Sequence, residues 1–451
     1  MTTSVQTTGT RAATTLGAAL LGFFVVTLDA VIVNVALPEM RADLGGGITG
    51  LQWVVDGYTL MFAAFLLSAG SLVDRIGAKR AFGLGVGVFV LTSLACGVAP
   101  TLPALVVFRF LQGTAAAVVM PSSMALIAQA YPDPVRRGRA VAVWAMGGAV
   151  ASSAGPVLGG LLTTASWRWI FLITVPVGVV AVVLLARVAP SARHRAPFDR
   201  TGQAVGAVAA AALVYGAIEA GRSGFTAPHV VAAFALAVAG LAGFVPVEAR
   251  STHPVLPLEL LRSRTVVTVV VVGFAFMVGY YGMPFVLSLV LQQRGLSPVE
   301  TGAVFLPMML AGLVLTPIVP RVTERAGTRP VVTAGLALIA GGLAVLAVLP
   351  TTTPGWVIAA AMVPVGVGGP TVIPPIIAVL LGAVGARRAG TASGVLNTSR
   401  QLGGALAVAV FGALLAGPSG WDTGMRVSLL LAAAIAAAAA LAAVAGLGTR
   451  H

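Results

Sequence analysis

The segment GSLVDRIGAKR at residues 70–80 has a counterpart, PRVTERAGTRP, at residues 320–330, an offset of 250 residues. In both copies an acidic residue and an arginine precede a glycine and another basic residue, and apolar runs lie on either side. The arginine pair at 136–137 likewise recurs at 387–388, an offset of 251 residues. Two matches at almost the same offset indicate that the chain contains an internal duplication.

The composition places the apolar runs in a membrane. Of the 451 residues, 58% are hydrophobic and 9% are charged, and the mean hydropathy is +1.01. Soluble domains carry about a quarter charged residues, so soluble, disordered and disulfide-linked classes are excluded. Cys96 is the only cysteine, and the four histidines have no metal-ligand spacing. We therefore expect neither a metal site nor any other cofactor.

Fourteen segments are long and apolar enough to cross a bilayer, which takes about 20 helical residues each. They lie near residues 16–37, 51–70, 81–99, 103–128, 140–163, 169–187, 203–220, 229–248, 266–291, 300–319, 331–349, 355–382, 391–416 and 425–446. The duplication maps the first six segments onto the last six and leaves two inserted between them. The expected fold class is an all-α polytopic membrane protein with fourteen transmembrane helices.

This pattern predicts three parts of the chain. They are an N-terminal six-helix bundle at 1–187, two inserted helices with cytoplasmic connectors at 188–265, and a C-terminal six-helix bundle at 266–451. The connectors are too short to fold as separate domains. Two parallel halves around a site near the middle of the membrane are a transporter architecture.

The basic residues alternate between loops. With both termini in the cytoplasm, cytoplasmic loops and termini hold 20 of the 27 lysines and arginines, whereas external loops and helix ends hold five. This is the positive-inside pattern, and omitting one helix would invert every later loop. The pattern accounts for the net charge of +14. We therefore expect the lipid bilayer as a partner, and no nucleic acid.

Five segments occur in an order known from one family. They are LDAVIVNVALP at 28–38, GSLVDRIGAKR at 70–80, RFLQGTAAAVVMP at 109–121, GPVLGG at 155–160 and WRWIFLITVPVG at 167–178. With them the chain resembles the major facilitator superfamily, specifically its fourteen-helix drug:proton antiporters. The second half matches more loosely, through the repeat and NTSRQLGGALAVAV at 397–410, and Ala78 stands where the loop signature usually has arginine.

The resemblance implies a function. It implies a proton-coupled exporter of drugs, antibiotics or related amphipathic small molecules, which works by alternating access as a monomer in a bacterial inner membrane. Two alternatives stay open. One is a uniporter or symporter for a specific solute in the same superfamily, and the other is a membrane-embedded enzyme or sensor. The chain has no GxxxxGK[ST] segment and no visible Ser/His/Asp or Cys/His set, so we expect no enzymatic activity.

Asp29 is the first candidate for coupling to protons or substrate. It lies near the middle of its apolar segment, where a charge costs about 2.5–3.5 kcal/mol on insertion scales. Such residues usually face a cavity or a partner, and the resemblance supports a coupling role because family members carry an acid here. The alternative is a fixed ion pair with Arg109 or Arg400.

Three further charged residues lie inside apolar segments, of which Asp56 is the one nearer the outer end of its segment. Asp56 is the second candidate acid, and the alternative is an interfacial carboxylate wetted from outside. Arg109 has Gln112 on the same helix face and needs an acceptor, which Asp29 or Asp56 would provide, either as a coupling pair or as a permanent one. Arg400 has no acid near it in sequence. The family's additional acids in later helices are absent, which argues against a broad dication specificity, and two arginines against two acids leave the substrate's charge open.

The repeated loop is the expected gate. Its residues are Gly70, Asp74, Arg75, Gly77, Lys79 and Arg80, with Glu324 and Arg325 in the second copy. An acid–base pair at a helix end can cap a neighbouring helix and latch two helices together, and alternating access would break and remake that latch. The alternative is ordinary positive-inside topology, which explains the arginines but neither the glycine nor the acids.

A cluster of small residues marks the fifth segment. Gly155, Pro156, Gly159 and Gly160 place small residues on one face and remove a backbone donor. This pattern predicts close helix packing and a kink. The resemblance identifies it with the antiporter motif of the family.

Overall fold

The computed structural model describes residues 2–191, 199–251, 256, 258–384, 389–417 and 420–447. Within these residues the secondary structure is entirely helical. The elements are α1 (Thr2–Leu44), α2 (Gly47–Ile76), α3 (Ala78–Gly97), α4 (Leu102–Ala130), α5 (Pro134–Ala165), α6 (Trp169–Leu172), α7 (Thr174–Ala186), α8 (Arg200–Ser223), α9 (Pro228–Arg250), η1 (Leu258–Arg262), α10 (Arg264–Gln293), α11 (Pro298–Leu315), α12 (Val319–Ala326), α13 (Thr328–Val348), α14 (Gly355–Ala383), α15 (Ala389–Ala416) and α16 (Trp421–Gly446).

The expected number of membrane spans is confirmed over these residues. Thirteen helical stretches are long and apolar enough to cross a membrane, and α2 is the fourteenth when its two bent parts, Gly47–Leu66 and Ser68–Ile76, count as one span. Some basic residues of the positive-inside count lie outside the described residues, as does the second copy of the arginine pair. They are Arg193, Arg195, Arg387, Arg388 and Arg450.

Two predicted spans are interrupted. The span expected at 169–187 is divided into α6 and α7, and the one expected at 300–319 ends at Leu315, before the short helix α12. Prolines explain both breaks, because a proline has no amide hydrogen to donate to the carbonyl four residues earlier. Pro176 lies in the first turn of α7, and Pro317 lies between α11 and α12.

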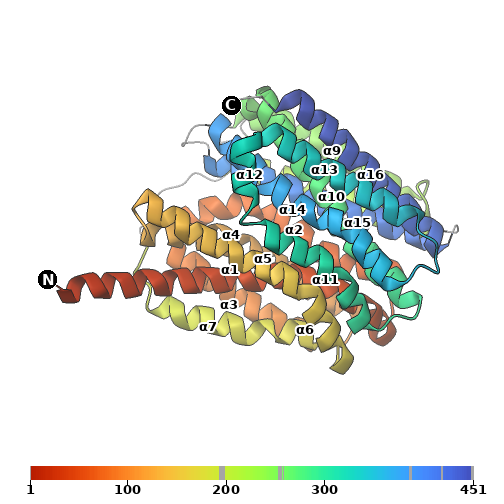
Figure 1. Ribbon diagram of the computed structural model, residues 1–451, viewed down its shortest axis with the longest axis horizontal. Helices are drawn as coiled ribbons and strands as arrows, with labels where there is room; N and C mark the ends of the chain where they lie inside the picture. The colour runs from red at the N-terminus through yellow and green to blue at the C-terminus, as the bar shows by residue number, and fades with distance from the viewer. Residues whose placement is uncertain are drawn as a thin grey trace.

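The helices pack as two groups with a hairpin beside them (Figure 1). In the first group α1 packs on α4, α5 and α7, and α4 packs on α2 and α3; in the second, α10 packs on α15 and α16, and α13 on α14 and α16. The hairpin of α8 and α9 contacts both groups, since α8 packs on α2 and on α15. We therefore propose that the chain divides as expected, at 1–187, 188–265 and 266–451.

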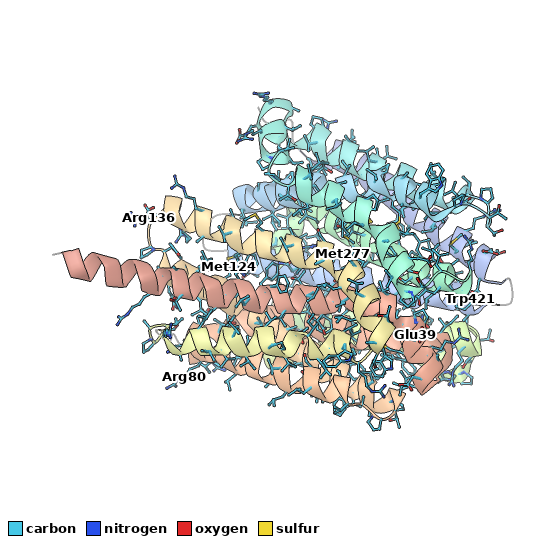
Figure 2. The ribbon with its side chains drawn as sticks, turned by 60° about the horizontal axis from the view of Figure 1, so that its bottom comes forward. Glu39, Arg80, Met124, Arg136, Met277 and Trp421 are labelled. Carbon is cyan, nitrogen blue, oxygen red and sulfur yellow. The ribbon has the colours of Figure 1, made fainter. Side chains whose placement is uncertain are left out.

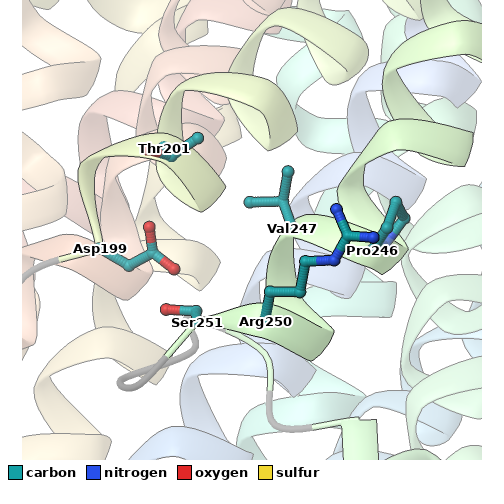
Figure 3. A pocket seen from close by; sticks show the side chains of 6 residues that line it. All are labelled: Asp199, Thr201, Pro246, Val247, Arg250 and Ser251. Carbon is teal, nitrogen blue, oxygen red and sulfur yellow. The ribbon is translucent and has the colours of Figure 1, made fainter.

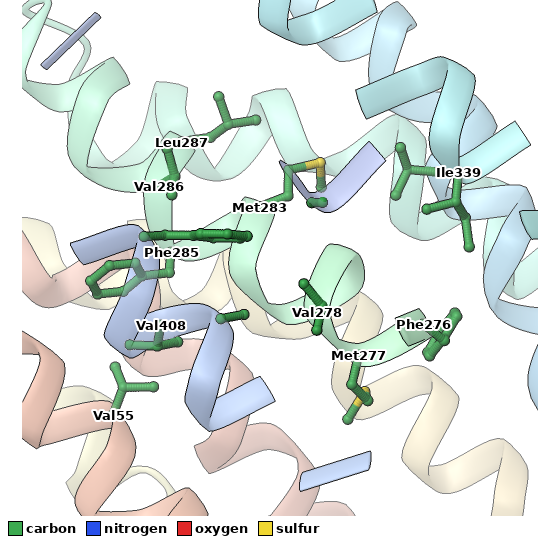
Figure 4. Packing of buried hydrophobic residues seen from close by; sticks show 14 of the residues in the cluster. Val55, Phe276, Met277, Val278, Met283, Phe285, Val286, Leu287, Ile339 and Val408 are labelled. Atoms are coloured by element: carbon green, nitrogen blue, oxygen red, sulfur yellow. The ribbon is translucent and has the colours of Figure 1, made fainter. Parts of the chain in front are cut away.

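One apolar cluster extends across the two groups (Figure 4). It includes Val55 of α2, Phe285 of α10 and Val408 of α15. Residues 32–37 of α1 and 282–291 of α10 are buried without interruption. A helix beside lipid buries only one stripe, so these uninterrupted stretches are enclosed by protein on all sides.

The two uninterrupted buried stretches, 32–37 and 282–291, lie toward the end of the molecule at which the two groups of helices meet. Figure 2 places Arg80 and Arg136 toward the end from which the N-terminal helix projects, and Glu39 and Trp421 toward the other end. Beyond the middle of α1, Gln292 Nε2 of α10 donates a 2.8 Å hydrogen bond to the carbonyl of Val35. The two groups are therefore closed against each other on the side of Glu39, which the charge pattern assigns to the outside.

Candidate functional site

Asp29 and Arg109 form an ion pair enclosed within the first group of helices. Their side chains are 0% and 1% exposed, and Arg109 Nη1 donates a 2.5 Å hydrogen bond to Asp29 Oδ2. Gln112 Nε2 donates to the other carboxylate oxygen, Oδ1, at 3.0 Å. Of the two partners that the sequence left open for Asp29, the structure therefore has Arg109 and not Arg400.

Hydrogen bonds and two aromatic rings hold the guanidinium of Arg109 in place. Its Nε donates to the carbonyl of Val54 at 2.9 Å, and Nη1 also donates to Gln112 Oε1 at 2.7 Å. The rings of Tyr58 and Phe171 lie with their centroids 4.4 and 5.7 Å from its central carbon, in range for cation–π attraction. All these partners belong to the first group, so the cluster holds α1, α2, α4 and α6 together.

Two members of this cluster were not identified from the sequence. Ser93 Oγ of α3 accepts a 2.9 Å hydrogen bond from Gln112 Nε2, and the Tyr58 hydroxyl donates to the carbonyl of Val26 at 3.1 Å. Serine and tyrosine are common in membrane helices, and only the depth of Ser93 and Tyr58, similar to that of Arg109, could have indicated them.

Asp56 is equally buried but has no hydrogen-bond partner among the described residues. It is 0% exposed, and neither carboxylate oxygen has a hydrogen-bond partner among the described residues. Its side chain is thus enclosed in this conformation and not wetted from outside. A carboxylate without partners is costly in such surroundings when it is charged, but much less so when it carries a proton.

Asp56 lies on the face of α2 opposite the ion pair. At 100° per residue, Val54 and Tyr58, which contact Arg109, lie on the other side of the helix. One turn before Asp56, Gln52 Nε2 donates to the carbonyl of Ala409 in α15 at 2.6 Å. One turn after it, Leu60 packs in an apolar cluster with residues of α8 and α15. Asp56 therefore lies where the first group meets α8 and the second group.

Arg400 has a different environment in α15. Its side chain is half-buried, Nη1 donates to Asn397 Oδ1 at 3.0 Å, and Nε is buried without a partner. No acidic side chain among the described residues pairs with it. Tyr281 of α10 lies against α15 one turn after Arg400, where a Cβ at Gly404 would be 3.6 Å from Tyr281 Cβ.

The loop expected to form the gate makes no latch in this conformation. Asp74, Arg75, Glu324 and Arg325 are exposed, and none of them forms an ion pair with a described residue. Neither acid caps the helix that follows, because the N-terminal caps of α3 and α13 are glycines without a side-chain hydrogen bond. The latch therefore stays a proposal for another conformation.

Other residues of this loop have clear structural roles. Gly77 and Gly327 adopt φ of 87° and 85°, a left-handed conformation that favours glycine, and this shared geometry supports the duplication. Lys79 fixes the start of α3, since Nζ donates to the carbonyl of Val188 at 2.5 Å and its amide to Ser191 Oγ at 3.0 Å. Gly70 has open space around it, and Arg80 is exposed.

The glycines of the small-residue motif in α5 pack closely against α1. A Cβ atom at Gly155 would lie 3.0 Å from Val31 Cγ1, and one at Gly159 would lie 2.9 Å from the carbonyl oxygen of Ile32. Both contacts are closer than a side chain allows. These two glycines let α5 lie directly on α1.

The same motif also contacts the second group. A Cβ at Gly160 would lie 2.6 Å from the carbonyl oxygen of Pro298 in α11, and one at Gly302 would lie 2.4 Å from that of Pro156. Backbone therefore meets backbone where α5 and α11 cross. This contact is part of the closure at the end of the molecule near Glu39.

An open cavity of about 460 Å³ lies between the start of α8 and the end of α9 (Figure 3). Its lining residues are Asp199, Thr201, Pro246, Val247, Arg250 and Ser251. Desolvation would raise the pKa of Asp199, but hydrogen bonds from Ser251 and from the amides of Gly202 and Thr201 outweigh it and lower the pKa. Because Asp199 also caps α8, we interpret the cavity as part of the helix ends and not of a transport path.

Among the described residues, no group of three or more histidine, cysteine, aspartate or glutamate side chains could hold a metal ion. A family model described as Major Facilitator Superfamily matches residues 19–408. The chain belongs to the major facilitator superfamily.

Relatives of this facilitator are named for resistance and export. It is 36% identical to the methylenomycin A resistance protein of Streptomyces coelicolor, over 91% of this chain and 87% of that protein. It is 38% identical to the multidrug resistance protein Stp of Mycobacterium tuberculosis, over 89% and 75%. It is 34% identical to the tetracenomycin C resistance and export protein of Streptomyces glaucescens, over 89% and 76%.

The facilitator also shares its fold with solved transporters. A POT family transporter in complex with a thioalcohol-conjugated peptide superposes with a TM-score of 0.71, covering 95% of this chain and 94% of the other, at 13% identity. At that identity the likeness concerns the fold alone.

Proposed function

We propose that this facilitator is a proton-coupled exporter of drugs, antibiotics or related amphipathic small molecules. Similarity over most of the chain to proteins named for antibiotic resistance supports export. We place the protein in a bacterial inner membrane with both termini in the cytoplasm, on the basis of the positive-inside pattern. We also propose that the protein works as a monomer, as the family resemblance implies.

The contrast between the two deep carboxylates is the observation that carries the proton coupling. Asp29 accepts hydrogen bonds from both Arg109 and Gln112, which stabilise its charged form. Asp56 has no such bond, so its protonated form suits the closed state described here. We therefore propose Asp56 as the proton carrier, although the sequence favours Asp29.

The position of Asp56 supplies a mechanism for the exchange. It lies where α2 meets α15 and α8, so movement of the two halves against each other changes its access to water. A proton taken up from the outside would be enclosed as the outer side closes, and released when the interface rearranges toward the cytoplasm. The cluster of Asp29, Arg109 and Gln112 would keep the helices of the first half together during this movement. Alternatively, the hydrogen bonds of this cluster would break in a second step.

Transport into inverted membrane vesicles tests this proposal. A resistance panel in a bacterium lacking its own pumps first identifies a transported compound. We expect vesicles with an acidic interior to accumulate this compound and a protonophore to abolish the accumulation. Asp56→Asn should also abolish it while leaving binding intact, whereas Asp43→Asn, a surface control in α1, should not.

Two outcomes would contradict the proposal. Accumulation that persists without a gradient and requires ATP would exclude proton coupling. Accumulation in vesicles whose gradient has the opposite direction would identify a symporter. If Asp56→Asn transported against a gradient at the native rate and Asp29→Asn did not, the carrier would be Asp29.

A further inference from the structure

Arg400 is the deep charged residue that the proposed coupling leaves without a partner. Among the described residues, Asp29 and Arg109 neutralise each other, and Asp56 suits its uncharged form because no donor faces it. Arg400 stays charged at any physiological pH, since a guanidinium does not lose its proton in proteins. The second half therefore presents an uncompensated positive charge near the middle of α15.

The hydrogen bonds of Arg400 are also incomplete. A guanidinium has five N–H donors, and a single hydrogen bond joins this one to a described residue, the bond to Asn397. Asn397 is itself oriented, because its Nδ2 donates to the carbonyl of Ser393 at 3.0 Å. Arg400 Nε is buried and has no hydrogen-bond partner among the described residues. A buried donor is normally satisfied, so Nε has the property of a site that lacks its ligand.

The surroundings of Arg400 offer an apolar surface as well. Gly273 leaves room for its stem, since a Cβ there would lie 3.1 Å from Arg400 Cγ. Tyr280 and Tyr281, near the middle of α10, are both half-buried. Tyr280 stacks on Phe276 with ring centroids 4.8 Å apart. An aromatic surface thus lies on the helix that Arg400 contacts.

We propose that Arg400, with Asn397 and Tyr281, forms an anion subsite in the second half and that the exported molecules are amphipathic acids bearing a carboxylate or phenolate. The acidic group would pair with Arg400, and the apolar body would pack on Tyr280, whose ring Phe276 supports from behind. A cationic amphiphile would meet an uncompensated positive charge there. This proposal rests on the proposed function, because it names the substrate class of that exporter.

Binding of three matched probes tests the subsite. The probes are 2-naphthoate, neutral 2-naphthamide and cationic 2-naphthylmethylammonium, measured by equilibrium dialysis with the purified full chain in detergent. We expect naphthoate to bind most tightly. Arg400→Gln should weaken naphthoate binding about ten- to a hundredfold, the range for hydrogen bonds to charged groups, and leave naphthamide binding unchanged.

Two further variants separate charge from folding. Arg400→Lys keeps the charge without the fork of donors and should retain the preference for naphthoate at lower affinity. Arg262→Gln removes an exposed arginine of η1 and should bind like the native protein. If Arg400→Gln does not fold, the proposal is tested by whether the native protein and the Arg400→Lys variant bind naphthoate more tightly than the neutral and cationic probes.

Three outcomes would overturn the proposal. They are the absence of any preference of the native protein for naphthoate, tighter binding of the cationic probe, and equal losses of naphthoate and naphthamide binding in Arg400→Gln. None of these measurements needs a membrane gradient. A failure of proton coupling would appear in the vesicle experiment and leave these affinities unchanged.

Discussion

Replacing Asp29 by asparagine removes the charge of the buried carboxylate while nearly preserving its shape. Arg109 would then stay charged among Val54, Tyr58 and Phe171 without an anion. Removal of one partner from a buried ion pair costs about 3–5 kcal/mol. The asparagine can still accept one hydrogen bond from Arg109, so we expect the lower end of this range.

Cys96 provides the assay for this loss. It is the chain's only cysteine, is 0% exposed, and its Sγ lies 3.8 Å from Gln112 Oε1 within the cluster. A thiol-reactive maleimide dye can modify it only when the packing around the cluster opens. A loss of about 3 kcal/mol raises the population of the open state by about two orders of magnitude. We expect Asp29→Asn to be labelled faster by that factor in the purified protein.

Two further variants show whether the ion pair is the cause. Asp43→Asn makes the same substitution in the same helix, but Asp43 and its partner Arg168 are 46% and 34% exposed. Surface pairs contribute little, so labelling should stay close to the native rate. Adding Arg109→Gln to Asp29→Asn removes the unpaired charge and should slow the labelling again. Native labelling in Asp29→Asn, or no recovery in the double variant, would refute the reasoning.

Three other predictions follow from the geometry. Asp56→Asn should leave Cys96 labelling at the native rate, because no hydrogen bond within the described residues is lost, and a large increase would reveal a structural partner. Gly302→Ala places a Cβ 2.4 Å from a carbonyl oxygen of α5, so it should push α5 and α11 apart and lengthen the distance between spin labels on these two helices. Gly341→Ala is the control, because the space around Gly341 is open, and it should leave that distance unchanged. In a cysteine-free background, an impermeant maleimide added to intact cells should label Thr352→Cys but not Ser191→Cys, and the reverse would invert the topology.

Much of the fold could be predicted because it follows from one-dimensional properties. Length and hydropathy give the spans, and the alternation of basic loops gives their orientation. The breaks near Pro176 and Pro317 were missed, although the proline rule would have predicted them. A membrane span is recognised from the mean hydropathy of about 20 residues, and a single proline hardly changes that mean.

The pairing within the site could not be predicted, because it depends on which helix faces meet. All four residues lie inside apolar segments. The sequence therefore allowed either Arg109 or Arg400 as the ion-pair partner of Asp29, and either Asp29 or Asp56 as the partner of Arg109. The rotation of α2 about its own axis determines which acid faces Arg109, since it directs Tyr58 toward Arg109 and Asp56 toward α15. That rotation is fixed by tertiary packing, which the sequence pattern of a single helix does not contain.

The separation of 80 residues between Asp29 and Arg109 imposes an order on biosynthesis. At about 5–20 residues per second, the ribosome reaches Arg109 roughly 4–16 s after Asp29, so α1 enters the bilayer before its ion-pair partner exists. The 13 leucine, isoleucine, phenylalanine and valine residues at 16–37 contribute about −4 to −8 kcal/mol to insertion, against about 2.5–3.5 kcal/mol for the carboxylate. The strongly apolar character of α1 is therefore a requirement of the translocon step that precedes pairing.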